Sequence, residues 1–341
     1  MKRNVNIKDI AKIAGVGVTT VSRVLNNHPD VKKETREQIL SIIEEYHYIP
    51  NNSARNLKLS ATKTIGVLVK GIYNPFFSRI VRVIELEIAK HGFSMILHYN
   101  PKDCVSSDTN VATEFIKEKR LSGLICLGGN YDISEAHHFE ALETPIVICS
   151  AVTLGTAERE DISTVGIDDE EAAYFAVVKL IEYGHKEIAM IRIKDDDCSG
   201  SKIRYEGYKR ALSAQKIDFR EEFVAVGDFS YESGHKAMNE LLDRDIHISA
   251  VFVATDMMAI GAARAILERG LNIPDDISVL GFDGIEFTQY FMPSISTIEQ
   301  PVGLLGEKSV ETIIDMINGK KNVHCTLDTR FLKRESLKKL K

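Results

Sequence analysis

From residue 64 onward, short apolar runs alternate with longer segments of helical periodicity. The runs read "TIGVLVK", "FSMILHY", "SGLICLGG", "PIVICS", "AMIRI", "AVFVAT" and "SVLGF". Parallel strands need a crossover connection, usually a helix, so this alternation predicts parallel sheets with helices on both faces. Seven or more strands are more than most single sheets contain, and 341 residues are more than a single hydrophobic core usually serves. We therefore expect an α/β fold in which two lobes with doubly wound parallel sheets flank a cleft.

The first 50 residues have a different pattern, that of a small helical unit. In "IKDIAKIAGVGVTTVSRVLNN" (7–27), apolar residues recur at i, i+3, i+4 and i+7 before Gly15, which ends a first helix. "TTVSRVLN" continues as a second helix, and residues 34–49 supply a third amphipathic segment. The residues expected to face a shared core are Ile7, Ile10, Ala11, Ala14, Val21, Val24, Leu25, Ile39, Ile42, Ile43 and Tyr46. The pattern therefore predicts a three-helix unit.

The outward face of the second helix is polar. It carries Thr19, Thr20, Ser22, Arg23 and Asn26. Short polar side chains let a helix approach the major groove of DNA and bond to phosphates and base edges. A small helical cap with a solvated face would show the same pattern, so the pattern alone leaves both interpretations open.

Charge is distributed unevenly between this front segment and the rest of the chain. The net charge of −6 argues against a nucleic-acid binder if the chain is taken as a whole. Residues 1–60, however, contain ten Lys or Arg and six Asp or Glu, a formal charge of +4. Residues 61–341 contain thirty-three and forty-three, a formal charge of −10. This asymmetry predicts that only the front segment meets a polyanion.

An ordered set of motifs resembles one protein family. "IKDIAKIAGVGVTTVSRVLNN", "ETREQI", "YIPNNSARNLK" and "KTIGVLV…NPFFSRIV" are followed by "GIDDEEAA", "YGHKEIAMI", "RYEGYKRAL", "ATDMMAIGAARA", "PDDISVLGFDGIE", "STIEQP" and "RFLKRES". Together they are similar to the lactose-repressor/galactose-repressor (LacI/GalR) family of bacterial transcriptional regulators, over essentially the whole chain. The resemblance implies a helix-turn-helix DNA-binding domain and a two-lobed, periplasmic-binding-protein-like effector domain.

The resemblance also implies boundaries for these parts. They are a DNA-binding domain over residues 1–50, a hinge over 51–63 and an effector-binding and dimerisation domain over 64–341. The first lobe of that domain would comprise about 64–162 and 293–325, and the second about 163–292 and 326–341. The family's tetramer-forming C-terminal helix does not follow "RFLKRES", so we expect a homodimer.

The DNA contacts implied by the family fall on two segments. Val18 and Thr19 would begin the recognition helix and meet base edges, Arg23 would reach a base or phosphate, and Thr20 and Ser22 would lie nearer the backbone of the DNA. In the hinge, Leu57 would enter the minor groove with Ala54 and Arg55 alongside. One departure is Gly17, which stands where the family commonly has Ser and which supplies no side-chain acceptor.

The effector residues implied by the family lie beside the strand ends, which face the cleft in a doubly wound fold. They are Phe76, Phe77, Asp168, Arg204, Phe229, Thr255, Asp256 and Asp283. The arginine fork suits paired hydroxyls or a carboxylate, the carboxylates accept from hydroxyls, and the aromatic rings cover a sugar face. Asp168 would serve equally well as a helix cap. The effector is expected to be a sugar or sugar derivative, although Lys70, Leu127, Ser150 and Ala151 depart from the family's common ligand contacts.

Several rival classes lack their sequence signals. There is no G-x-S-x-G, P-loop or H-E-x-x-H motif, and the adjacent His137 and His138 lack metal-ligand spacing, so we expect no enzyme, cofactor or metal. A catabolite-control regulator of the same family would need a tyrosine, an aspartate and arginines after the "QP" motif. Here the segment reads "QPVGLLGEKSVETI" and contains none of them, so we do not expect this type of regulator.

The compartment is predicted from signals that the chain lacks. An exported sugar-binding protein would need a signal peptide, and a membrane protein an apolar run of about 18 residues; neither is present. Five dispersed cysteines without a C-x-x-C pair are typical of reduced thiols. These absences predict a cytoplasmic protein. The family resemblance implies a homodimer with two partners, palindromic double-stranded DNA and a small sugar-like molecule.

Replacing the hinge leucine tests the DNA-binding interpretation. Leu57→Ala should weaken specific operator binding by about 1–3 kcal/mol, because an apolar wedge in the minor groove stabilises only the bent, specific complex. Binding to random DNA should be nearly unchanged. Anisotropy titrations against an operator and a random duplex measure both, and an equal loss on the two duplexes would exclude a wedge.

Overall fold

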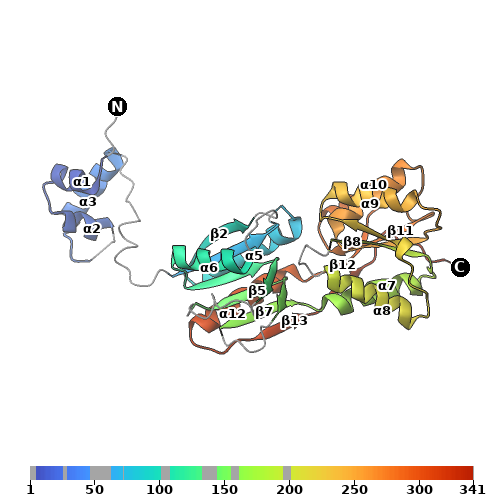
Figure 1. The fold of residues 1–341 in the computed structure, drawn as a ribbon. Helices are drawn as coiled ribbons and strands as arrows, with labels where there is room; N and C mark the ends of the chain where they lie inside the picture. The colour runs from blue at the N-terminus through green and yellow to red at the C-terminus, as the bar shows by residue number, and fades with distance from the viewer. Residues whose placement is uncertain are drawn as a thin grey trace. The chain divides into compact units, whose positions relative to one another are not determined.

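The computed structural model describes residues 5–25, 29–46, 63–71, 73–100, 108–132, 144–154, 161–194 and 201–340. Its contacts divide the chain into two compact units, Met1–Thr62 and Lys63–Lys341. The hinge residues Ala54, Arg55 and Leu57 lie outside the described residues, so their roles stay predictions. Each unit is considered by itself below (Figure 1).

The N-terminal unit is the expected group of three helices. They are α1 (Ile7–Ile13), α2 (Val18–Leu25) and α3 (Lys33–Glu45). Asn6 and Asp9 form a capping box at the start of α1, in which each side chain accepts the other's backbone N–H. The buried core consists of Ile10, Ala11, Ala14, Val21, Val24 and Ile39, with Ile7, Leu25, Ile42 and Ile43 packed against it. Tyr46 was expected in this core but is 42% exposed, because α3 ends one residue before it.

The second unit contains two sheets, each at the centre of a lobe. In the first, six described strands lie in the order β13-β7-β5-β3-β1-β2, and all neighbours are parallel. These strands are β1 (Thr64–Lys70), β2 (Ser94–Asn100), β3 (Gly123–Leu127), β5 (Ile146–Cys149), β7 (Ile162–Ile167) and β13 (His324–Leu327). A separate parallel pair, β4 (Asn130–Asp132) and β6 (Val152–Leu154), follows two of them in the chain.

Helices cover both faces of the first sheet. On one face, α5 (Pro75–Lys90) and α12 (Val302–Ile317) share a hydrophobic cluster with the strands. On the other face, α6 (Asp108–Lys119) contributes Ala112, Phe115 and Ile116 to a separate cluster. Strands covered on both sides read as continuous apolar runs, which explains the sequence "TIGVLVK" of β1.

The second sheet has the order β14-β12-β11-β10-β8-β9 among the described strands. The strands are β8 (Ile188–Ile193), β9 (Val224–Gly227), β10 (Ala250–Val253), β11 (Ser278–Asp283), β12 (Ser296–Glu299) and β14 (Arg330–Leu332). All pairs are parallel except that of β12 with the edge strand β14. Figure 1 shows α9 (Tyr231–Leu242) and α10 (Asp256–Glu268) on one face, with α7 (Asp169–Glu182) and α8 (Ser201–Ala214) on the other. The short elements η2 (Glu221–Phe223) and α11 (Phe287–Tyr290) complete this lobe.

The chain passes between the lobes at three places. It leaves the first sheet after β7, returns after β12 and crosses again between β13 and β14. The first two crossings fall later than the lobe boundaries expected from the sequence. β7 pairs with β5 and β13, so it completes the first sheet instead of opening the second lobe, and β12 pairs with β11 and β14. Within the described residues, no helix is both long and apolar enough to cross a membrane.

The helices α9 and α10 approach so closely that their contact requires glycine. A Cβ on Gly261 would lie 1.9 Å from the carbonyl oxygen of Tyr231, and one on Gly234 would lie 2.2 Å from that of Met258. Because side chains at the N-termini of both helices face the interlobe cleft, this contact sets the distance between two parts of the site.

Gly261→Ala should therefore destabilise the second unit by about 1–3 kcal/mol, the usual cost of overpacking. The matched control is Gly303→Ala, at the second residue of α12, where a Cβ meets nothing within 4 Å. Because the full helix-interior gain is about 0.5–1 kcal/mol, the gain in this first turn should not exceed about 1 kcal/mol. Denaturant unfolding measures both. Equal shifts for the two variants would mean that the helix contact is not tight.

Candidate functional site

A cavity of about 340 Å³ lies between the two lobes of the second unit. Much of its polar lining comes from the carboxyl ends of strands. Lys70 ends β1, Gly128 follows β3 and Ser150 follows β5; in the second lobe, Asp228, Thr255, Asp283 and Gln300 end or follow β9, β10, β11 and β12. Doubly wound sheets place ligands at this edge, because the loops that follow the strands open there.

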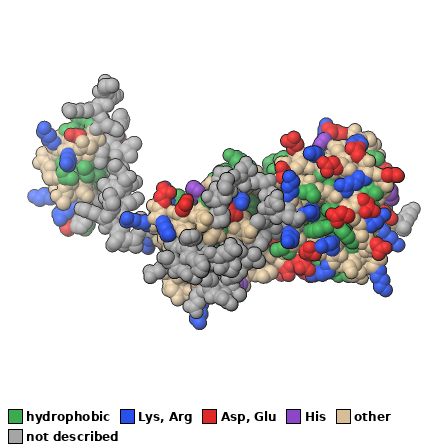
Figure 2. Space-filling view, in the orientation of Figure 1, with side chains coloured by type: hydrophobic (Ala, Val, Ile, Leu, Met, Phe, Trp, Pro, Cys, Tyr) green, Lys and Arg blue, Asp and Glu red, His purple; other side chains and the backbone are tan. Residues whose placement is uncertain are grey.

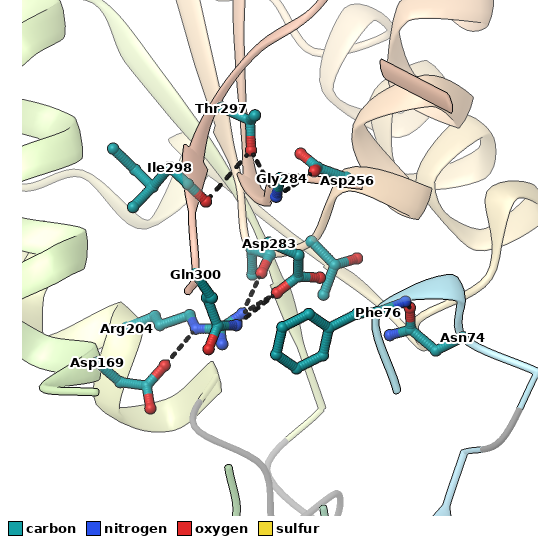
Figure 3. A network of polar contacts seen from close by, with 12 residues as sticks. Asn74, Phe76, Asp169, Arg204, Asp256, Asp283, Gly284, Thr297, Ile298 and Gln300 are labelled. Carbon is teal, nitrogen blue, oxygen red and sulfur yellow. Dashed lines mark hydrogen bonds and ion pairs between the residues drawn. The ribbon is translucent and has the colours of Figure 1, made fainter. Parts of the chain in front are cut away.

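Arg204 of α8 is the centre of a polar network at the floor of this cavity (Figure 3). Its side chain is buried, and its Nε donates to Asp169 Oδ1 at 2.7 Å. Its Nη1 donates to the carbonyl of Ala254 at 2.6 Å and lies 3.6 Å from Asp283 Oδ1. The guanidinium also lies over the ring of Phe282, 3.8 Å from its centroid. A buried cation needs such partners, since an unpaired charge away from water is strongly destabilising.

Asp283 completes this network from the end of β11. Gln300 Nε2 donates to its Oδ1 at 2.9 Å, whereas Gln300 Oε1 is buried without a partner among the described residues. Burial raises the pKa of Asp283 to about 6, although Arg204 and Gln300 both act to lower it. The residue also has φ +116°, a backbone conformation that side chains other than glycine rarely adopt. Such strain persists where surrounding contacts hold it, often at functional sites.

The first lobe contributes a second cation. Lys70 Nζ lies 3.0 Å from Oδ2 and 3.1 Å from Oδ1 of Asp108, which is itself buried. Asp108 also accepts from Asn100 Nδ2 and from the backbone N–H of Asn130. The lysine charge is therefore already neutralised by a fixed carboxylate behind the cavity wall.

Aromatic rings form much of the remaining surface. Phe76 and Phe77, at the start of α5, pack edge to face with centroids 5.2 Å apart. Tyr73 and Tyr99 make a similar contact at 5.7 Å. From the second lobe, Phe229 reaches the cavity with a positive φ of 74°. These rings offer apolar faces to a flat or ring-shaped ligand.

Most of the expected effector residues meet at this cavity. Phe76, Phe77, Arg204, Phe229, Thr255 and Asp283 all line it. Asp168 does not; its Oδ1 caps α7 by accepting from the N–H of Glu171 at 2.9 Å. Asp256 does not either, because its carboxyl turns inward and accepts from the backbone N–H groups of Gly284 and Ile285. Whether the lining residues contact an effector stays a prediction.

Several lining residues were missed in the sequence. Asp169 lines the cavity where Asp168 was expected to do so. The two residues differ in their position at the start of α7, because Asp168 is the N-cap and Asp169 is the first helical residue. Gln300 directly follows β12, so the strand-end rule that identified Asp283 would also have found it. Tyr73 and Tyr99 carried no such signal.

The N-terminal unit presents its own candidate interface, along α2. Val18 is 41% exposed, Thr19 and Arg23 are exposed, and Thr20 and Ser22 are half-buried. Val21 and Val24 hold the opposite side of the helix in the core. In contrast, acidic and basic side chains are interspersed on the visible face of the lobe that contains α9 and α10 (Figure 2).

Comparisons with known proteins agree with this geometry. The profile described as bacterial regulatory proteins, lacI family, matches residues 6–51, and that of a periplasmic binding protein-like domain matches residues 177–337. The HTH-type transcriptional regulator MalR of Clostridium butyricum is 44% identical over 332 residues, covering 97% of this chain and 98% of that protein.

Solved structures are similar over nearly the whole chain. The Lac repressor dimer bound to operator and the anti-inducer ONPF has a TM-score of 0.80 at 28% identity, covering 98% of this chain and 99% of that one. The transcriptional regulator CelR in complex with cellobiose has a TM-score of 0.72 at 30% identity, covering 97% and 99%.

A helix-turn-helix unit joined to a two-lobed α/β unit with a polar interlobe cavity defines a class of one-chain, ligand-responsive transcriptional regulators. Within that class, the chain belongs to the LacI family of bacterial regulatory proteins.

The raised pKa of Asp283 predicts a pH dependence of stability. The folded protein holds this proton more tightly than the unfolded chain, in which an aspartate titrates near about 3.9. The resulting stabilisation is present below that value and is lost as the pH rises through about 6. Asp283→Asn cannot ionise, so it should lose less stability than the wild type between about pH 4 and about pH 7. Thermal unfolding across this range measures the difference, and parallel curves for the two proteins would contradict it.

Proposed function

We propose that this protein is a sequence-specific DNA-binding repressor of carbohydrate-utilisation genes whose operator affinity is changed by a small sugar-like effector bound between the lobes. The observation that carries the proposal is the cavity itself, in which carboxylates, an arginine and aromatic faces converge from both lobes. A molecule that touches both lobes favours one interlobe arrangement over another, which is the requirement for a ligand-driven switch.

Hydroxyl groups fit the polar part of the cavity. Each hydroxyl both donates and accepts, so it can donate to Asp169 or Asp283 and accept from Arg204. The rings of Phe76 and Phe229 suit the apolar C–H face of a sugar. A ligand lacking one of these hydroxyls would leave a buried polar group unsatisfied, which makes such a site selective.

The charges of the cavity favour an uncharged sugar. Its described lining contains two cations, Lys70 and Arg204, and three carboxylates, Asp169, Asp228 and Asp283. Both cations are engaged with carboxylates, at 3.0 Å for Lys70 and 2.7 Å for Arg204. A phosphate would therefore meet an excess of negative charge, and no fixed cation would be available without breaking an existing ion pair.

The DNA-binding half of the proposal rests on α2. Its exposed residues Val18, Thr19 and Arg23 match the start and middle of a recognition helix. One such helix per protomer implies a homodimer on a palindromic operator, and the hinge residue Leu57 would mark the centre of that site. A protein of this kind works in the cytoplasm and performs no catalysis.

Arginine substitutions on α8 test the link between cavity and DNA. Arg204→Ala should weaken effector binding at least about tenfold and abolish the ligand response, since it removes a charged hydrogen-bond donor. Operator affinity without ligand should stay near that of the wild type. Arg210→Ala is the matched control, because this arginine of the same helix pairs with Glu170 and Glu171 outside the cavity lining.

The measurement is operator binding with and without the mono- and disaccharides that shift the melting temperature of the wild type. An Arg204→Ala protein that responds at unchanged ligand concentration would show that the arginine is not a ligand contact. Loss of operator binding without ligand would instead assign it a purely structural role.

A further inference from the structure

Asp256, at the start of α10, is a fully buried carboxyl that holds backbone instead of ligand. Its Oδ2 accepts from the N–H of Gly284 at 2.7 Å (Figure 3). It also accepts from the N–H of Ile285 at 2.8 Å. Its Oδ1 lies against β11, where a Cβ on Gly281 would come within 2.1 Å of it. The strand thus leaves room for this carboxyl, which bonds to the segment that follows.

That segment carries a side chain into the other lobe. Ile285 is 1% exposed and belongs to the hydrophobic cluster formed otherwise by β1, β3, β5, β7, α5 and α12 of the first lobe. Arg79 of α5 donates from Nη1 to the carbonyl of Gly284 at 3.3 Å. Met257 and Ile260 of α10 pack against the same cluster. The 283–285 segment is therefore a contact between the lobes.

The backbone of this segment is held in an unusual conformation. Asp283 and Gly284 have φ angles of +116° and +77°, and a Cβ on Gly284 would lie within 2.8 Å of three atoms of Glu299. Two consecutive residues in the left-handed region turn the chain sharply from the cavity wall into the first lobe. Glycine adopts a positive φ at little cost, so the strain lies at Asp283, which needs surrounding contacts to hold it. Gln300 bonds to the Asp283 side chain, and Asp256 holds the two backbone amides that follow it.

We propose that Asp256 is a positioning residue that clamps the 283–285 segment, so that the cavity wall at Asp283 and the interlobe contact at Ile285 move as one unit. Two residues that line the cavity are next to this clamp in the chain. Thr255 directly precedes Asp256, and Asp283 directly precedes Gly284 and Ile285, whose amides donate to Asp256. A ligand that binds Thr255 or Asp283 and shifts their positions would therefore also shift Ile285 within the hydrophobic cluster of the first lobe. This inference concerns the geometry of the joint and does not depend on which molecule fills the cavity.

Hydrogen exchange of the full chain without ligand tests the clamp. Asp256→Ala should raise exchange about tenfold or more in a peptide spanning 283–288, since the Ile285 amide loses its acceptor and the Gly284 amide keeps only the longer bond to Thr297 Oγ1 at 3.3 Å. Asp256→Asn keeps an acceptor oxygen at the same position and should restore exchange to within about threefold of the wild type. The control is Asp276→Ala, which removes a carboxylate that accepts from the backbone N–H of Asn272 in the same lobe. It should leave 283–288 unchanged.

Ile285→Ala tests the other half of the joint and stays informative if Asp256→Ala does not fold. Exchange should rise in first-lobe peptides from α5 and α12, because that cluster loses a buried side chain. The 256–258 peptide should keep its wild-type exchange. These results together would show that Asp256 holds the 283–285 segment and that this segment contacts the first lobe through Ile285.

Other outcomes would overturn the proposal. They are wild-type exchange at 283–288 in Asp256→Ala, an equal rise there in Asp256→Ala and Asp256→Asn, or unaltered first-lobe exchange in Ile285→Ala. None of them bears on whether a sugar binds, so failure of the clamp and failure of the proposed function are distinguishable.

Discussion

The buried guanidinium of Arg204 determines what the rest of the site must provide. A cation shielded from water needs acceptors, and Arg204 finds them in Asp169 at the start of α7, Asp283 at the end of β11 and the Ala254 carbonyl after β10. One side chain thereby ties together three elements of the second lobe. Because two of its partners are carboxylates that line the cavity, it also leaves a surface that suits hydroxyl groups better than anions.

One of these carboxylates, Asp283, connects the cavity to the contact between the lobes. Asp283 faces the cavity, and the next two residues enter the contact with the first lobe under the control of Asp256. Packed elements of this kind shift between discrete arrangements more readily than they deform, so a change at the cavity wall is passed on as a movement of lobes. The helices that read DNA belong to a separate unit of the chain, so a movement of the lobes is how ligand binding would affect them.

The sequence predicted the layers of the fold well, because strand and helix periodicities differ and both were regular. It also predicted Thr255 and Asp283 at the cavity, since each directly follows or ends a strand. It misplaced Asp256, and of the two roles it left open for Asp168 the structure shows the helix cap. Each has an adjacent residue in the cavity wall, Asp169 and Thr255 respectively, and one step along a helix rotates the direction of a side chain by about 100°. The interlobe crossings were shifted because pairing of β7 and β12 depends on neighbours distant in the chain.

The most direct test of the central claim, that paired carboxylates make the cavity selective for uncharged polyhydroxyl ligands, is calorimetric titration of the full chain. The titrants are glucose, maltose and cellobiose together with their 6-phosphates. The account predicts heat of binding from at least one unphosphorylated sugar and weaker or no binding of its phosphate. A phosphate that binds more tightly than its parent sugar would contradict it.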